Sequence, residues 1–238
     1  MQERLDKIIA SMGQYSRREV KKLVREGSVL VDGRIARSAE DKCDPLQNTI
    51  TVCGEVLDYR RYTYVMLHKP AGVLSATEDG RGETVLDLLS PELRKIGVFP
   101  VGRLDKDTEG LLLLTDDGEL AHDLLSPKKH VDKVYYARTD GELTERDCAA
   151  FTAGITLDDG LHCLPAKLEI LRAGETSECL VTLHEGKFHQ IKRMLAWCGK
   201  PVTYLKRLKM GPLTLDETLA PGEYRLLTAE EIADLSNR

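Results

Sequence analysis

Apolar residues near the start of the chain recur at helical intervals. The positions are Leu5, Ile8, Ile9 and Met12, and Gly13 follows them. Spacings of three and four residues place side chains on one face of an α-helix, and glycine is common just beyond a helix end. The pattern therefore predicts an amphipathic helix that ends at Gly13.

A second helix is predicted to start at Ser16. Ser16 and Glu19 match a capping box, and Gly27 supplies a stop signal. At 100° per residue, five cations share a sector of about 140° on this helix, and Val20, Leu23 and Val24 lie on the other side. The cations form what we call the basic ridge: Arg17, Arg18, Lys21, Lys22 and Arg25.

Two hairpins are predicted to follow the helices. Asp32-Gly33 comes directly after the apolar run 29–31, and Asp-Gly is a strong hairpin-turn signal. A second strand pair is expected around residues 50–52 and 56–57, with Cys53-Gly54 at the turn. Residues 1–58 are therefore expected to form a small helix-helix-hairpin domain.

The pattern changes after the polar residues 58–62, which we interpret as a linker. Many short β-like runs follow, and helical stretches are expected only at 84–89 and 190–198. Helices that do not alternate regularly with strands disfavour a Rossmann or TIM-barrel layout. We therefore expect an α+β protein, in which residues 63–238 form one domain built on a mainly antiparallel sheet.

Composition argues against a membrane protein and against a secreted one. The 238 residues are 31% charged, and no apolar run approaches the roughly 18–20 residues that span a bilayer. The first residues are polar and lack the apolar core of a signal peptide. We therefore expect a soluble cytoplasmic protein with no membrane partner.

Charge is unevenly distributed along the chain. The net charge is −5, yet residues 1–25 carry seven Lys or Arg against three acids, and residues 186–209 carry seven Lys or Arg and no acid. Two basic patches on an acidic protein could bind a polyanion locally. Two solvated faces would give the same counts, so charge alone leaves both interpretations open.

The cysteines do not suggest a metal site. None of the six forms a C-x-x-C pair, and no Cys/His group has the spacing of zinc ligands. Without an export signal they are expected to be reduced thiols. We therefore predict no metal.

The densest candidate for chemistry is the segment from Gly102 to Gly110, GRLDKDTEG. Its two glycines bracket Asp105, Asp107 and Glu109, and four leucines follow. A carboxylate in a constrained loop before a buried strand suits a nucleophile or a general base. Calcium binding is disfavoured because four leucines occupy positions seven to ten of the twelve-residue ligand loop and no helix precedes it. A glycosidase carboxylate pair and a solvated acidic turn remain alternatives.

A second candidate is the basic segment EGKFHQIKRM at residues 185–194. If a helix starts near Phe188, Ile191 and Leu195 face inward and Lys192 can reach an acidic partner. Lys187, Arg193 and Lys206 would then be available for phosphates. The alternative is a basic amphipathic helix without a catalytic role. Adjacent tyrosines in KVYYA point to opposite faces of a strand, so one of them could line a site.

Several of these segments together resemble the RsuA-type pseudouridine synthases. They are GRLDKDTEG followed by LLLLT, then KVYYA, EGKFHQIKRM and YLKRLKMGPLTL. The stretch RLDKIIASMGQYSRREVKKLVREGSVLVDG resembles a small RNA-binding module found in a ribosomal small-subunit protein. The resemblance covers almost the whole chain, in the family's order.

The resemblance implies that a uridine in RNA is detached from its glycosidic nitrogen, rotated, and rejoined to ribose through a ring carbon. No cofactor or metal is implied. Matched residue by residue, Asp105 would be the essential carboxylate, Tyr135 the active-site tyrosine, and Lys192 the basic partner of the aspartate. Arg103 and Thr108 would shape the loop and contact the nucleotide, and Leu205 would border the pocket.

The expected partner is ribosomal RNA, of the small subunit by the wording of HQIKRM, either free or in an assembling ribosomal particle. The target base would be flipped out of its stack, and the protein is expected to be a monomer. The alternatives are the same reaction on large-subunit RNA, a non-catalytic RNA-binding assembly factor, and a glycosidase acting on soluble sugars. Asp105, Tyr135 and Lys192 together favour the enzyme.

Overall fold

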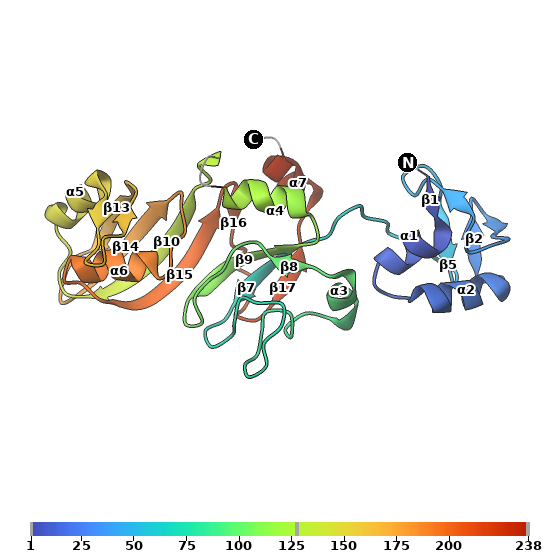
Figure 1. Cartoon of the computed structure of the whole chain (residues 1–238), viewed down its shortest axis with the longest axis horizontal. Coiled ribbons are helices and arrows are strands. Elements are labelled where there is room, and N and C mark those ends of the chain that lie inside the picture. Colours follow the sequence, from blue (N-terminus) through green and yellow to red (C-terminus); the bar gives the residue numbers. More distant parts are fainter. Residues whose placement is uncertain (1, 127–128, 237–238) are drawn as a thin grey trace. The chain divides into compact units, whose positions relative to one another are not determined.

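The computed structural model describes residues 2–126 and 129–236. Contacts divide the chain into two compact units. The N-terminal unit is Met1–Thr63 with Leu89–Val98, and the sheet unit is Tyr64–Leu88 with Phe99–Arg238. Figure 1 labels the elements of both units.

The N-terminal unit packs two helices against a small sheet. Its elements are β1 (Glu3–Arg4), α1 (Leu5–Ser11), α2 (Arg17–Arg25), β2 (Val29–Val31), β3 (Arg34–Ile35), β4 (Lys42–Cys43), β5 (Ile50–Val52), β6 (Glu55–Val56) and α3 (Pro91–Ile96). Strands are ordered β3-β2-β5-β6, and β1 pairs with β4. The core buries Leu5, Ile8 and Ile9 of α1 and Val20 and Val24 of α2.

Local signals explain this unit well. The Ser16 N–H donates to the Glu19 carboxylate at 2.7 Å, and the Glu19 N–H donates to the Ser16 hydroxyl at 3.3 Å. Asp32 and Gly33 adopt positive φ values of 49° and 76° in the β2–β3 turn. Positive φ at both central residues is what a type I′ hairpin turn requires. The predicted capping box and this hairpin are therefore confirmed.

The sheet unit is built on nine strands. They are β7 (Tyr64–Lys69), β8 (Phe99–Pro100), β9 (Glu109–Thr115), β10 (Lys133–Asp140), β13 (Lys167–Arg172), β14 (Thr176–Leu183), β15 (Val202–Met210), β16 (Leu213–Thr214) and β17 (Tyr224–Leu226). The main order is β13-β14-β10-β15-β9-β7-β17. Its pairings are antiparallel except for β9 with β15, which run parallel. The expected α+β class with a mainly antiparallel sheet is confirmed.

Helices flank this sheet: α4 (Gly118–Leu125), α5 (Glu145–Ala153), α6 (Gln190–Trp197) and α7 (Ala229–Ser236), with a separate short pair β11 (Ile155–Thr156) and β12 (His162–Cys163). The helix expected at 190–198 is present as α6. The helix expected at 84–89 is wrong, because this segment is a turn. The Val85 N–H bonds the Leu74 carbonyl and the Thr84 N–H bonds the Asp87 carboxylate, so tertiary and side-chain bonds replace the helical ones.

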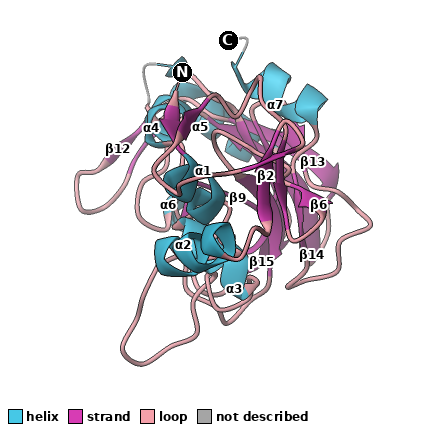
Figure 2. Ribbon diagram, turned by 90° about the vertical axis from the view of Figure 1, so that its right-hand side faces the viewer, coloured by secondary structure: helices cyan, strands magenta, loops and turns pink. Residues whose placement is uncertain are grey.

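Strand β9 is an interior strand of the sheet, between β15 and β7. Residues Leu111, Leu112, Leu113 and Leu114 are all fully buried, so both faces of the strand are covered. Leu111 and Leu113 belong to the core cluster that also holds residues of α4 and α7, and these two helices lie near each other in Figure 1. The sheet strands appear in magenta in Figure 2. Within the described ranges, no helix is both long and apolar enough to cross a bilayer.

Candidate active site

The loop that carries Asp105 joins β8 to β9 and is shaped by glycines at both ends. Gly102 and Gly110 have positive φ values of 79° and 105°. A Cβ on Gly110 would lie 2.2 Å from the carbonyl oxygen of Arg207, because β9 and β15 approach closely at this register position. Glycine is therefore required where the loop enters β9.

Hydrogen bonds from the end of β7 and from the residues after it hold the backbone of this loop in place. The Lys69 ammonium donates to the carbonyls of Pro70, Lys106 and Thr108 at 2.9, 3.2 and 2.9 Å. The Ser75 hydroxyl accepts the Leu104 N–H at 3.1 Å and donates to the Leu104 carbonyl at 2.9 Å. Both residues flanking Asp105, Leu104 and Lys106, are thus fixed through their backbones.

Lys69 is fully buried, which is unusual for an ammonium group. Burial lowers its pKa to about 8, although the carboxylates of Asp107, Asp105 and Glu109 act in the opposite direction. Three donors on the protonated ammonium match the three carbonyls of the brace. Lys69 therefore holds the loop and contributes a positive charge beneath it.

Asp105 is paired with Lys192 at the start of α6. The Lys192 ammonium lies 3.0 Å from Oδ2 of Asp105 and 2.5 Å from Oδ1 of Asp107. Partial burial lowers the pKa of Lys192, but hydrogen bonds with the two aspartates outweigh it and raise the pKa. The Lys192 hydrogen bond lowers the pKa of Asp107. The lysine therefore stays charged and fixes one oxygen of Asp105.

Tyr135 and Leu205 form the apolar side of the site. Tyr135 on β10 pairs in register with Arg207 on β15, and Ala137 pairs with Leu205. Residues directly opposite in an antiparallel pair share a face, so Tyr135 and Leu205 point to the same side of the sheet. Both side chains are more than nine-tenths buried.

One cavity brings together all three residues that were predicted to be catalytic. It is lined by Arg103, Asp105, Thr108, Tyr135, Lys187, Lys192 and Leu205. The buried Thr108 hydroxyl has no hydrogen-bond partner among the described residues. Such an orphaned polar atom facing a cavity is suited to a ligand group. A wider depression of about 560 Å³, which shares Arg103, Asp105 and Tyr135, adjoins this cavity and falls in the range of small-ligand pockets.

Other predicted phosphate ligands do not meet there. Arg193 donates to Asp159 at 2.6 Å and does not line the cavity. Lys206 is opposite Tyr136 in the β10–β15 register, on the other face of the sheet from Leu205. Lys187, by contrast, does line the cavity, and its ammonium lies 3.0 Å from the Glu185 carboxylate.

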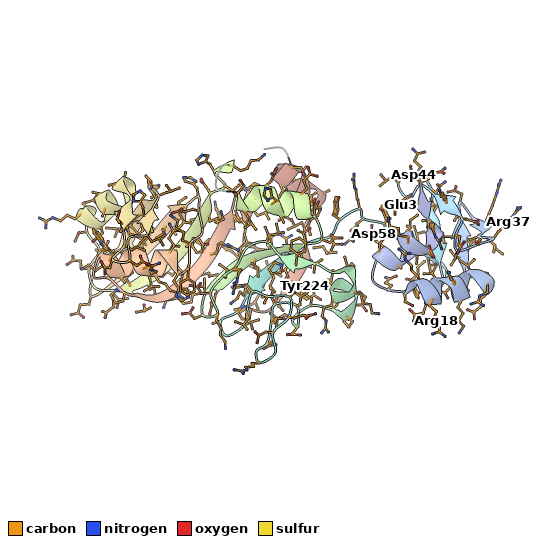
Figure 3. The ribbon with its side chains drawn as sticks, in the orientation of Figure 1. Glu3, Arg18, Arg37, Asp44, Asp58 and Tyr224 are labelled. Atoms are coloured by element: carbon orange, nitrogen blue, oxygen red, sulfur yellow. The ribbon has the colours of Figure 1, made fainter. Side chains whose placement is uncertain are left out.

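The basic ridge lies on the exposed face of α2. All five of its side chains are exposed, whereas Val20 and Val24 are buried. Figure 3 shows Arg18 pointing away from the body of the N-terminal unit. Lys21 and Lys22 each lie 3.7 Å from a glutamate, Glu40 and Glu26. The ridge is therefore a solvent-facing cationic surface.

Sequence reasoning missed two residues that support the loop, Lys69 and Ser75, and gave His189 no place beside the carboxylate. His189 Nε2 lies 3.6 Å from Oδ1 of Asp105. Lys69 could have been noticed, because it ends an apolar strand and directly precedes Pro70, a position at which its side chain is buried. Nothing in the local sequence indicated that Ser75 would bond the loop.

The arrangement is suited to chemistry at a sugar carbon. One oxygen of Asp105 is held by Lys192, the loop is rigidly braced, and an aromatic and an aliphatic side chain border the space beside the carboxylate. Such a fixed carboxylate can act as a nucleophile or stabilise a developing cation, while Tyr135 can contact a flat base.

Comparisons with known proteins agree with this geometry. Residues 63–197 match the family model described as RNA pseudouridylate synthase, and residues 3–45 match the S4 domain. The chain is 49% identical over 231 residues to an uncharacterized RNA pseudouridine synthase, YtzG, of Bacillus subtilis, covering 96% of each. It is 40% identical to the ribosomal small subunit pseudouridine synthase A of Vibrio cholerae, covering 98% of this chain and 99% of the relative.

A solved structure supports the same conclusion. The crystal structure of a pseudouridylate synthase is 37% identical and superposes with a TM-score of 0.69, covering 98% of this chain and 99% of that one. Family model, full-length relatives and fold all agree, and the predicted resemblance is confirmed. The chain belongs to the RNA pseudouridylate synthase family and carries an S4 domain ahead of its synthase domain.

Proposed function

We propose that this enzyme converts one specific uridine of small-subunit ribosomal RNA into pseudouridine, with Asp105 as its essential carboxylate. The observation that carries the proposal is the braced Asp105–Lys192 pair, which shares one cavity with Tyr135. Relatives that align over the full length and are named for the small ribosomal subunit support the choice of RNA.

The reaction is a balanced isomerisation. The bond between the ribose C1′ and N1 of the base breaks, a bond from C1′ to C5 forms, and the proton of C5 is replaced by one on N1. Asp105 attacks the sugar or stabilises its cationic or glycal-like form, and Lys192 orients the carboxylate through the 3.0 Å contact with its Oδ2 atom. Tyr135 stacks on the base or takes part in the proton transfer.

The substrate base has to leave its stack to enter this cavity. Unstacking costs a few kcal/mol and is cheapest in an already unpaired region. Arg103, exposed at the rim, and the orphaned Thr108 hydroxyl contact the extruded nucleotide. Lys187 contributes positive charge beside the RNA backbone, and Arg193 and Lys206 act at the periphery.

The basic ridge of the S4 domain holds the RNA while the sheet unit performs the chemistry. Structured RNA is recognised largely through shape and backbone contacts, which suits an exposed row of cations. An assembling particle in the cytoplasm is the proposed setting, because a base is extruded most easily where the RNA is not yet stacked and paired. The enzyme works as a monomer.

Mapping pseudouridine in ribosomal RNA tests the proposal. RNA from cells with and without the gene is compared at every uridine, and purified protein is incubated with naked small-subunit RNA, naked large-subunit RNA and partly assembled small subunits. We expect one small-subunit uridine to be modified only when the protein is present. An Asp105→Asn protein is the matched control and should leave that uridine unmodified.

Other results would redirect the assignment. A modified site in large-subunit RNA would keep the reaction and change the substrate. Tight RNA binding without any pseudouridine, together with a ribosome-assembly defect on gene deletion, would favour the non-catalytic assembly factor.

A further inference from the structure

Phe188 is the most exposed large apolar side chain of the sheet unit within the described residues. Its side chain is 75% exposed, against 50% for Trp197 and Leu171. Burying the exposed part of a phenyl ring in a complex would be favourable. A single exposed apolar side chain is ordinary on a protein surface, so what distinguishes this ring is where it lies and what it contacts.

The position of Phe188 is fixed by its neighbour. The rings of Phe188 and His189 stack with centroids 3.8 Å apart and planes inclined by 20°. His189 has a φ of 50°, a left-handed conformation that non-glycine residues rarely adopt. Strained backbone of this kind persists where the surrounding structure requires it and gathers at functional sites.

The two stacked rings lie at the edge of the catalytic cavity. His189 Nε2 is 3.6 Å from Asp105, and both Phe188 and His189 line the wide depression that contains Asp105 and Tyr135. One face of the phenyl ring is covered by His189. The opposite face therefore forms a flat apolar platform next to the place where a flipped uridine would enter.

The charges around the platform identify its occupant as a nucleotide. Arg103, Lys106 and Lys187 line the same depression. A flat ring with cations at its border matches the chemistry of a nucleobase joined to phosphates, and every base offers a face for stacking. Flipping one base also removes a stacking partner from each neighbour, so a neighbour needs a new surface.

We propose that the Phe188–His189 pair stacks on the nucleobase adjacent to the flipped uridine and so stabilises the extruded state. The proposal rests on the proposed function and adds a requirement: the neighbour must be able to leave its own stack. The platform thereby favours target uridines in loops or bulges over those in continuous helices.

Removal of the ring is the direct test. Phe188→Ala removes the platform, Phe188→Trp restores a ring, and Trp197→Ala removes an exposed ring of α6 that lines a different depression. Binding is measured with an unmodified transcript of the small-subunit ribosomal RNA, independently of turnover. We expect Phe188→Ala to weaken binding about ten-fold, the loss typical of one stacked base, whereas the other two variants retain wild-type affinity within a small factor.

Single-turnover kinetics refine the test. The RNA concentration that gives half the maximal rate should rise in Phe188→Ala by a larger factor than the rate at saturation falls, because Phe188 holds RNA and does not react. A short RNA that contains the mapped uridine is then made with the neighbouring base removed and its ribose and phosphate kept. With wild-type protein, the abasic RNA should raise the half-saturating RNA concentration as much as the alanine substitution does with intact RNA. With Phe188→Ala, the abasic RNA should raise this concentration no further.

Two results would overturn the proposal. One is binding and kinetics of Phe188→Ala that match wild type. The other is a full additional loss of RNA affinity when the abasic RNA is combined with the Phe188→Ala protein. If the proposed function is wrong, wild-type protein will form no pseudouridine in any RNA. The comparison of transcript binding would still decide whether Phe188 contacts RNA, because it does not depend on turnover.

Discussion

At the scale of single residues, the site depends on one carboxylate held by one lysine. Asp105→Asn keeps the shape of the side chain and removes its charge. We expect pseudouridine formation to fall to less than about one hundredth of wild type, with RNA affinity nearly unchanged. Single-turnover rates and filter binding measure the two quantities, and a variant that keeps a tenth of the wild-type rate would exclude Asp105 as the essential group.

Lys192→Met tests whether the lysine serves the carboxylate or a phosphate. Because Lys192 lies 3.0 Å from Asp105, its loss leaves the carboxylate without its cation. We expect a strong fall in the rate at saturating RNA and a smaller change in affinity. A normal saturating rate, combined with weaker binding and a shallower salt dependence, would instead identify Lys192 as a backbone contact.

Lys69 is expected to give the protein a pH-dependent stability. Burial lowers its pKa to about 8, so between pH 8 and its unfolded pKa of about 10.4 the unfolded chain binds more protons. Stability from this group therefore rises with pH in that window, by up to roughly 3 kcal/mol, and is lost as the pH falls through 8. The free energy of unfolding of wild type should increase with pH relative to that of Lys69→Met.

The control for this titration is Lys167→Met, which removes an exposed lysine. Its stability should run parallel to wild type across the same pH range in urea unfolding. A wild-type curve parallel to that of Lys69→Met would show that Lys69 does not titrate in this window.

At the scale of elements, the parallel junction of β9 and β15 determines the site. Gly110→Ala would place a Cβ 2.2 Å from the Arg207 carbonyl, and forcing the strands apart should cost roughly 3 kcal/mol. Gly54→Ala is a matched control, because Gly54 has a similar φ of 87° but no neighbouring atom within 4 Å. Thermal unfolding should show a clearly larger loss for Gly110→Ala, and equal losses would mean that the strands adjust.

Elements defined by adjacent residues were predictable from sequence. The capping box at Ser16 and the α6 helix follow from local hydrogen bonding and from apolar spacing, and both are present. The helix expected at 84–89 fails because Val85 bonds the distant Leu74 carbonyl. Helix α3 was missed although its signals, Ser90 before Pro91, are local and readable.

The resemblance named residues that the fold places side by side, but it did not indicate the contacts that surround them. Resemblance supplied Asp105, Tyr135 and Lys192, and the fold brings them to one cavity. The engagement of Arg193 by Asp159 could not be foreseen, because the two residues lie 34 positions apart and meet only through tertiary folding. The hydrogen bonds between Ser75 and Leu104 could not be foreseen either, because these residues are also distant in the sequence.

At the scale of the whole molecule, binding and chemistry are expected to be separable. Replacing Arg17, Lys21 and Arg25 by Gln removes three cations of the basic ridge. Each phosphate contact contributes about 0.7 unit to the slope of log affinity against log salt for single strands, so the loss of three contacts should make this slope shallower by roughly two units. The rate at saturating RNA should change little, because the residues assigned to chemistry belong to the sheet unit.

A matched variant replaces Lys129, Lys167 and Arg172 by Gln, which changes the net charge equally at exposed positions of the sheet unit outside the cavity. Its salt slope should match wild type. An unchanged slope in the ridge variant would make the ridge a solvated surface, and a collapsed saturating rate would mean that the S4 domain helps to assemble the site.

Because β9 pairs with β15, the segments that make up the site leave the ribosome at widely separated times during synthesis. Asp105 receives its lysine from α6 and its neighbouring strand from residues 202–210, about a hundred positions later in translation. Ribosomes add roughly 5–20 residues per second, so on the order of ten seconds separate the emergence of the aspartate from that of its partners. A nascent chain thus gains its cationic helix long before it gains a working catalytic centre, and premature chain termination after residue 150 would leave an RNA binder that cannot turn over its RNA.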